Sequence, residues 1–183
     1  SPSDRGPMST VAAFDRLPES EAARMLGACC GATRWVDGML ARRPFGDIRT
    51  LLAAADEVWS EMGPIDWREA FEHHPRLGES RSAEPQDDRE RTWSSGEQAG
   101  MRDAASSVRS ALAAANAAYE KRFGYICIIC ATGLGAAEIL TLTEERLANE
   151  PEDELTIAAE EQRKITRLRL LKLFHEPDKA VAS

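Results

Sequence analysis

GEQAGMRDAASSVRSALAAANAAYEKRF, residues 96–123, is the longest periodic stretch of the sequence, and it decides the fold class. Its apolar side chains recur at spacings of three and four, which is the period of one face of an α-helix. These side chains are Met101, Ala105, Val108, Leu112, Ala115 and Tyr119. The pattern predicts one long helix that packs through this stripe against other elements.

Helical patterns also dominate the rest of the chain. Residues 18–31 begin with polar residues and close on a glycine, as a capped short helix does. Further helices are predicted at residues 47–62, 66–73, 135–150 and 155–174. Two apolar stripes mark the first and last of these: Ile48, Leu51, Leu52, Ala55, Val58 and Trp59, and then Leu155, Ala158, Ile165, Leu168 and Leu171. Only YICIIC, residues 125–130, suits an extended segment, and no comparable second strand can pair with it. The sequence therefore predicts an all-α fold, a single-domain helical bundle.

Chain length fits one domain. A chain of 183 residues can bury a real core but is short for two domains. We expect a flexible leader at 1–10, the helical domain at 11–176 and a flexible tail at 177–183. Residues 79–93 are polar and contain a proline, which indicates a surface loop. The leader lacks the apolar stretch of a secretory signal.

Composition excludes several classes of protein. Hydrophobic residues make up 43% and charged residues 30%, a balance typical of soluble globular proteins. No apolar run approaches the roughly 20 residues that span a bilayer, so no membrane segment is expected. The net charge of -8 argues against a general nucleic-acid binder, because phosphate contacts need clustered Lys and Arg. A small anionic substrate remains compatible with this charge, because it responds to a local site.

The four cysteines indicate buried thiols in a reducing compartment. Cys29 and Cys30 are adjacent and would bridge each other only with strain, whereas Cys127 and Cys130 lie in an apolar run. The C-x-x-C spacing also permits a redox or zinc site. Packing is favoured, because redox cysteines of this kind are partly exposed and zinc needs further ligands.

Two histidines stand directly before a proline in FEHHPRLGES, residues 71–80. The residue before a proline is pushed out of the helical region, so the predicted helix ends near His73. His74 is then extended or in a turn, and its side chain can project into a cleft. Either histidine could instead cap the helix carbonyls, and His73 keeps that interpretation because it still lies on the helix.

A second polar cluster is WSSGEQAGM, residues 93–101. Ser94 stands three residues before Glu97, which is the spacing of a capping box at a helix start. Together with Gln98, the same side chains could also bind a polar ligand at the first turn, where backbone amides point outward. The cluster alone does not decide between these two hypotheses.

Taken together, ordered landmarks along the chain carry a specific resemblance. They are Trp35 and Val36, RRPF from Arg42, HPRLGE from His74, SSGEQAG from Ser94, NAAYEKRFGY from Asn116, EERLANEPEDE from Glu144 and RKITRLRL from Arg163. In this order the chain, from about Trp35 to Phe174, resembles the OHCU decarboxylase family. Members of that family convert 2-oxo-4-hydroxy-4-carboxy-5-ureidoimidazoline (OHCU) to (S)-allantoin in urate breakdown, without a cofactor. The resemblance implies an all-α bundle that forms a homodimer.

The resemblance also assigns candidate site residues. His74 matches the catalytic histidine and Pro75 the proline beside the substrate, while Glu97 matches the second acid/base group. Ser94 and Gln98 match residues that line the pocket. The backbone around Ile129 to Gly133 corresponds to the segment that hydrogen-bonds the ring and ureido group, and Arg169 corresponds to the arginine that binds substrate oxygens. No metal or cofactor is implied.

The chemistry fits these residue types. Loss of carbon dioxide pushes electrons into the adjacent C=N bond of the substrate, which is its own electron sink, so no cofactor is needed. A histidine can move the protons near neutral pH. We assign His74 as general acid/base and Glu97 as the group that orients the hydroxyl or tunes the imidazole, with Arg169 clamping oxygens.

Three departures from the family pattern were found. FGYIC replaces Phe-Gly-Phe-Pro-Phe, so Ile126 and Cys127 stand in place of a proline and an aromatic residue; Thr132 stands where a basic residue is common. The chain ends AVAS, without the peroxisomal tripeptide of many eukaryotic members, so a cytoplasmic enzyme is expected, coupled functionally to urate oxidase and hydroxyisourate hydrolase.

Three rival hypotheses stay open on the sequence. One is a family member that acts on another small ureido or keto-acid substrate, because FGYIC alters the pocket wall. Another is a metal-dependent hydrolase with His73, His74 and Glu97 as ligands, although adjacent histidines rarely point at one metal. The last is a non-catalytic helical interaction module, in which the histidines and Ser94 act only as caps.

Overall fold

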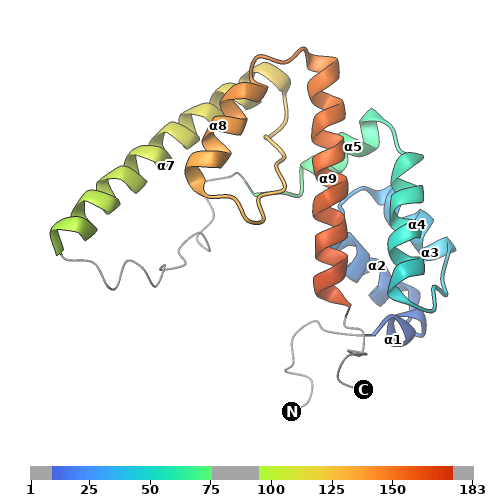
Figure 1. The fold of residues 1–183 in the computed structure, drawn as a ribbon. Helices are drawn as coiled ribbons and strands as arrows, with labels where there is room; N and C mark the ends of the chain where they lie inside the picture. Colours follow the sequence, from blue (N-terminus) through green and yellow to red (C-terminus); the bar gives the residue numbers. More distant parts are fainter. Residues whose placement is uncertain (1–9, 76–94, 175–183) are drawn as a thin grey trace. The chain divides into compact units, whose positions relative to one another are not determined.

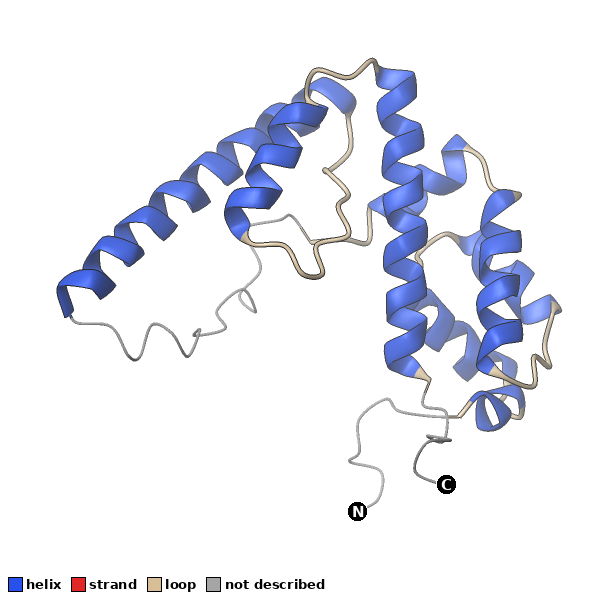
Figure 2. Ribbon diagram, viewed as in Figure 1, coloured by secondary structure: helices blue, strands red, loops and turns tan. Residues whose placement is uncertain are grey.

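The structure is a computed structural model that describes residues 10–75 and 95–174, with residues 95–103 described by their backbone only. Helices and connecting loops make up the described chain (Figure 2). The helices are α1 (Val11–Asp15), α2 (Glu19–Cys29), α3 (Thr33–Ala41), α4 (Ile48–Ser60), α5 (Pro64–Phe71), α7 (Ser95–Phe123), α8 (Ala136–Arg146) and α9 (Pro151–Leu173) (Figure 1). The all-α prediction is confirmed.

The chain divides into two compact units. Unit 1 comprises Ser1–His73 and Ala159–Ser183, and unit 2 comprises His74–Ala158. Helix α9 therefore contributes its first two turns to unit 2 and its remainder to unit 1. The substrate segment expected near Ile129 belongs to unit 2.

Unit 1 is built on the apolar stripe of α4. Five of its six predicted members are buried, and Ile48 is half-buried. Asp47 caps the helix, because its side chain accepts a hydrogen bond from the Thr50 amide at 2.8 Å. Trp35 donates from Nε1 to the Ala55 carbonyl (3.2 Å), and Trp59 donates to the Ala159 carbonyl (3.1 Å). These two indoles tie α3 and α9 to α4 inside unit 1.

Unit 2 places α7 against α8, which run side by side in Figure 1. Leu112, Ala115 and Tyr119 are buried as the stripe predicts, whereas Ala105 is exposed. The lengths explain this difference: α7 has 29 residues and α8 has 11, so α8 can cover only part of α7. The Met101 side chain lies outside the described residues.

On α9 the buried face differs from the predicted stripe. Leu171 is 44% exposed, whereas Gln162 is fully buried and Thr166 is 5% exposed. Gln162 donates from Nε2 to the Thr166 hydroxyl at 2.9 Å, so these polar groups satisfy each other in the core. The helix also begins earlier than predicted, with Pro151 at its first position and acidic residues in its first turn.

Two short helices, α1 and α3, were not predicted. They contain 5 and 9 residues, so each offers at most two or three turns of apolar periodicity. Among residues 10–75 and 95–174, no helix has both the length and the apolar character that a bilayer span requires.

Candidate active site

The histidine pair follows the end of α5. The helix ends at Phe71, two residues earlier than predicted, and His73 lies in the turn beyond it. A carbonyl oxygen can only accept, so Nδ1 of His73 donates to the Glu69 carbonyl in the last turn of α5 at 3.0 Å. The capping interpretation of His73 is confirmed. His74 is half-buried in a bend before the exposed Pro75.

The backbone of Gly31 lies directly against the His73 ring. A Cβ built on Gly31 would overlap the imidazole at Nδ1 and Cγ, so a larger residue would displace the ring. Thr33, two residues further on, holds Glu69 through its backbone amide (3.0 Å) and its hydroxyl (2.7 Å). The start of α3 and the end of α5 thus fix the turn from which the chain continues to His74.

Arg169 reaches the same stretch of unit 1 from α9. Its Nη1 donates to the Cys29 carbonyl at 3.4 Å, and the residue is half-buried. The guanidinium and the His73 ring therefore both lie against residues 29–31. Within unit 1, the structure places the predicted oxygen-binding arginine and the turn that ends at His73 around one short backbone segment.

The thiols beside Arg169 are held neutral. Burial raises the pKa of Cys29 to about 12 and that of Cys30 to about 11, although the positive charge of Arg169 acts in the opposite direction on both. Cys29, Cys30 and Cys127 are buried and form no disulfide, as predicted, and Cys130 is half-buried. Neutral buried thiols of this kind are poor nucleophiles.

Unit 2 contains the predicted substrate-binding backbone. Residues 126–131 form neither helix nor strand, and Ile129 is 5% exposed. Gly133, at the end of this segment, has φ of 82°, a conformation that favours glycine. Of YICIIC, residues 126–130 thus lie outside the helices and form no strand pairing in the described chain.

A buried ionic cluster supports this backbone and was not predicted as part of the site. Arg146 on α8 donates from Nη1 to the Ile128 carbonyl at 2.6 Å and from Nε to Glu154 Oε2 at 2.8 Å. Tyr119 donates its hydroxyl to Glu154, and Asn149 donates from Nδ2 to Glu154 Oε1 at 3.0 Å. The sequence signal was present in EERLANEPEDE, where an arginine precedes a glutamate by eight residues.

The pKa values in this cluster favour a charged Arg146 and a neutral Tyr119. Burial raises the pKa of Tyr119, and its hydrogen bond to Glu154 raises it further. For Arg146, burial acts against the charge, yet the hydrogen bond that it donates to Glu154 raises the pKa of the guanidinium above its usual value. The Glu154 side chain is fully buried, and the hydrogen bonds described above satisfy both carboxylate oxygens.

The second polar cluster lies largely outside the described residues. Ser94 precedes the described part of α7, and Glu97 and Gln98 lie in its first turn with only their backbone described. Their roles therefore remain predictions. In the described part of the chain, no three His, Cys, Asp or Glu side chains form a group that could hold a metal ion.

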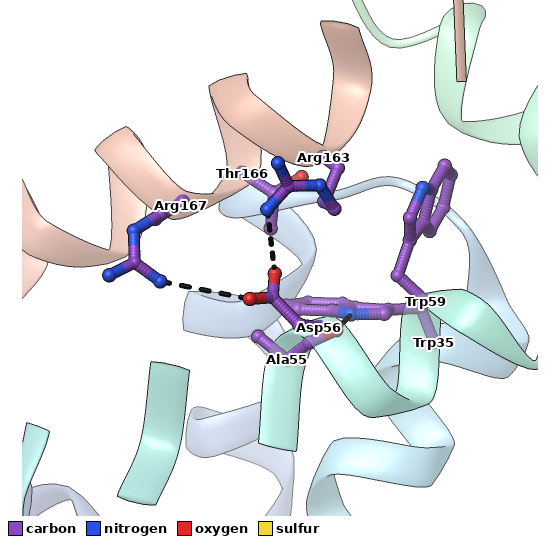
Figure 3. Close-up of a pocket in the computed structure, with 7 residues that line it drawn as sticks. All are labelled: Trp35, Ala55, Asp56, Trp59, Arg163, Thr166 and Arg167. Carbon is purple, nitrogen blue, oxygen red and sulfur yellow. Dashed lines mark hydrogen bonds and ion pairs between the residues drawn. The ribbon is translucent and has the colours of Figure 1, made fainter. Parts of the chain in front are cut away.

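A small cavity in unit 1 lies between α4 and α9 (Figure 3). Its volume is about 10 Å³, about the space of one water molecule. Asp56 faces it and pairs with Arg163 at 3.2 Å and with Arg167 at 3.8 Å. The cavity is too small for a ureidoimidazoline ring, so we do not assign the substrate to it. Its lining consists of Trp35, Ala55, Asp56, Trp59, Arg163, Thr166 and Arg167.

The described residues form an all-helical protein in which the turn at His73 and Arg169 both lie against one backbone segment of unit 1. The family model for OHCU decarboxylase matches residues 15–171. The chain belongs to the OHCU decarboxylase family.

Known proteins similar to this chain agree with the match. The uric acid degradation bifunctional protein TTL of Arabidopsis thaliana is 36% identical over 154 residues, covering 84% of this chain and 48% of the relative. A 2-oxo-4-hydroxy-4-carboxy-5-ureidoimidazoline decarboxylase of Amia calva is 45% identical over 62 residues, covering 34% of this chain and 35% of the relative. The chain thus spans about half the length of the first relative and about a third of the second.

A solved structure is also similar. The crystal structure of an OHCU decarboxylase in the presence of (S)-allantoin matches with a TM-score of 0.65 and 36% sequence identity. The match covers 80% of this chain and 94% of that one. The likeness therefore extends over nearly the whole of the solved chain.

Proposed function

We propose that the chain catalyses the cofactor-independent decarboxylation of OHCU to (S)-allantoin in urate degradation. The observation that carries the proposal is the family match over residues 15–171, which includes the His74, Glu97 and Arg169 positions. The 36% identity to an OHCU decarboxylase solved with (S)-allantoin supports the same substrate class.

In the proposed mechanism the carbon–carbon bond to the carboxylate breaks and its electrons move into the neighbouring C=N bond. Carbon dioxide leaves, and a proton is delivered to one face of the adjacent carbon. His74 is the general acid/base, and Glu97 orients the hydroxyl or tunes the imidazole. Arg169 neutralises substrate oxygens with a guanidinium that already lies beside a backbone carbonyl at 3.4 Å.

The remaining predicted residues bind the substrate in this proposal. Ser94 and Gln98 contribute polar side chains, Pro75 packs beside the ring, and the backbone at Ile129 donates and accepts hydrogen bonds. Ile129 is suited to this role because its segment belongs to neither helix nor strand, so that its peptide groups are not committed to a helix ladder.

We further propose a cytoplasmic homodimer that works together with urate oxidase and hydroxyisourate hydrolase. The Arabidopsis relative is named as a bifunctional protein of uric acid degradation, which supports coupling between steps. The instability of a substrate that decays to racemic product makes such coupling useful.

The test is circular dichroism of allantoin formation, with OHCU generated in place by urate oxidase and hydroxyisourate hydrolase. We expect the wild type to accelerate the (S) signal and His74→Ala to lose at least about 100-fold in rate, the usual scale of general acid/base catalysis. His175→Ala, at a histidine with no assigned role, is the matched control and should retain activity.

Failure of the folded wild type to accelerate the (S) signal would contradict the proposed substrate. Because FGYIC departs from the family pattern, other small ureido or keto-acid substrates would then be assayed against the same pair of variants. An active His74→Ala protein would instead remove the histidine from the catalytic role.

A further inference from the structure

We infer that Arg146, held by Glu154, is a positioning residue that sets the orientation of the peptide group between Ile128 and Ile129. The inference rests on the proposed function, in which the Ile129 backbone binds the substrate. A buried ion pair of unit 2 thus contributes to substrate binding through the backbone, without touching the substrate.

The geometric argument begins at the Ile128 carbonyl. Nη1 of Arg146 donates to this oxygen at 2.6 Å. A peptide bond is planar and trans, so the carbonyl of residue 128 and the N–H of residue 129 point in opposite directions in one plane. Fixing the direction of the Ile128 carbonyl therefore also fixes the direction of the Ile129 N–H.

The guanidinium is itself held in a fixed orientation. Its Nε donates to Glu154 Oε2 at 2.8 Å, its Nη2 donates to the same oxygen, and Nη2 also reaches the Tyr119 hydroxyl at 3.4 Å. Asn149 holds the other carboxylate oxygen at 3.0 Å. The planar fork of arginine can direct one edge at a carboxylate while a third nitrogen reaches a carbonyl, which a lysine ammonium cannot do in the same geometry.

Stability alone does not account for this arrangement. A buried ion pair often contributes no more to stability than well-packed apolar residues of similar volume, because desolvation offsets the attraction. The Glu154 side chain is fully buried and that of Arg146 is 10% exposed, so the pair carries a large desolvation cost. The pair can also fix the orientation of a backbone segment that has no helix or strand hydrogen bonds. Apolar residues could not perform this second role.

A misoriented Ile128–Ile129 peptide group should affect KM and kcat differently. A backbone group that binds the ring in the ground state and in the transition state contributes uniform binding, so its misorientation raises KM and leaves kcat nearly unchanged. For Arg146→Lys we expect KM to rise about tenfold, the effect of losing one hydrogen bond, with kcat within about twofold of wild type. The Kd of (S)-allantoin should rise by the same factor, as measured by calorimetry.

Two further variants make the test independent of folding. Arg146→Met combined with Glu154→Leu removes both charges together, which avoids an unpaired buried charge, and it should show the same rise in KM. Tyr119→Phe is the matched control, because it removes the hydrogen bond to Glu154 and the long 3.4 Å contact with Arg146 Nη2, but leaves the Arg146 bonds to Glu154 and to Ile128 in place. It should be less stable than wild type but keep its KM.

Amide hydrogen exchange at Ile129 adds a readout of the local structure. We expect faster exchange at Ile129 in both Arg146 variants than in Tyr119→Phe. Folded Arg146 variants with wild-type KM, or a Tyr119→Phe protein with an equally raised KM, would overturn the positioning role. A wild-type protein without activity on OHCU would overturn the proposed function itself, which separates the two failures.

Discussion

Gly31 has no side chain at the point where the His73 ring lies. The backbone two residues to either side is held in place, because Cys29 accepts a hydrogen bond from Arg169 and Thr33 donates one to Glu69. The absence of a Cβ therefore lets two elements of unit 1 approach at the turn that precedes His74. A contact between positions so distant in sequence has no signature in local periodicity, so sequence reasoning could not find it.

Replacing Gly31 by alanine tests this contact. The added Cβ would overlap the imidazole, so we expect the free energy of unfolding to fall by about 1–3 kcal/mol and the OHCU rate to fall because the turn to His74 shifts. Denaturant unfolding and the circular dichroism assay measure the two effects.

Gly27→Ala is the matched control. Apart from its chain neighbours and the backbone of its own helix, no heavy atom lies within 4 Å of a Cβ at Gly27 in α2, so stability should rise by about 0.5–1 kcal/mol without loss of activity. A Gly31→Ala protein that behaves like Gly27→Ala would show that the ring can move away at no cost.

The buried thiols predict a dependence of stability on alkaline pH. The pKa values of Cys29 and Cys30 are raised by burial to about 12 and about 11, so the unfolded chain loses these protons at lower pH than the folded chain does. Their contribution is fully present below the unfolded pKa near 9 and is lost as pH rises through 11 to 12. Between pH 8 and pH 10 the loss should be about 3 kcal/mol for the two thiols together.

Urea unfolding at pH 8 and pH 10 measures this loss. The Cys29→Ala/Cys30→Ala double variant removes both thiols and should show a smaller decrease over the same interval. An equal decrease in the variant and the wild type would assign the effect to other groups, such as the Tyr119 phenol.

At the scale of elements, α4 was predictable because its core consists of apolar residues at helical spacing. For α9, the sequence predicts that the helix forms but not which of its faces is buried. Its buried face includes Gln162 and Thr166, which satisfy each other, and Glu154, which pairs with Arg146. A pattern that assigns polar residues to solvent cannot identify such a face, because burial depends on partners that the fold supplies.

The indole of Trp59 links α4 to the part of α9 in unit 1. Trp59→Phe keeps the aromatic ring but leaves the Ala159 carbonyl without this donor. We expect the free energy of unfolding to fall by about 1–2 kcal/mol, because one buried hydrogen bond and some packing are lost while the Ala159 carbonyl keeps its bond within the helix. Thermal unfolding measures it.

Ile65→Thr is the control for this variant, because Ile65 is 85% exposed. Its stability should change by less than about 0.5 kcal/mol. If Trp59→Phe is as stable as Ile65→Thr, the indole hydrogen bond contributes nothing to the packing of α4.

At the scale of the whole molecule, the sequence predicted the helical class and the family, since ordered motifs extend along most of the chain. Of the candidate site, the capping role of His73 was predicted and is observed. The support from Arg146 was missed, because it depends on a carbonyl whose position only the folded backbone determines.

The proposed homodimer gives a prediction at this scale. One chain has a mass of 20.1 kDa, and we expect sedimentation at about twice this mass. Sedimentation velocity over a hundredfold range of concentration measures it. A single species at the mass of one chain throughout would contradict the dimer, while the assay with OHCU would show whether the monomer is active.

The division of α9 between the two units has a consequence for synthesis on the ribosome. Unit 2 ends at residue 158, whereas unit 1 needs Ala159, which Trp59 contacts across 100 positions, and Arg169, which contacts Cys29 across 140. Because synthesis proceeds from the N-terminus, residues 1–73 are made first, unit 2 next, and the part of α9 that completes unit 1 last. Unit 1 is thus completed after unit 2, and we expect its long-range contacts to slow its folding.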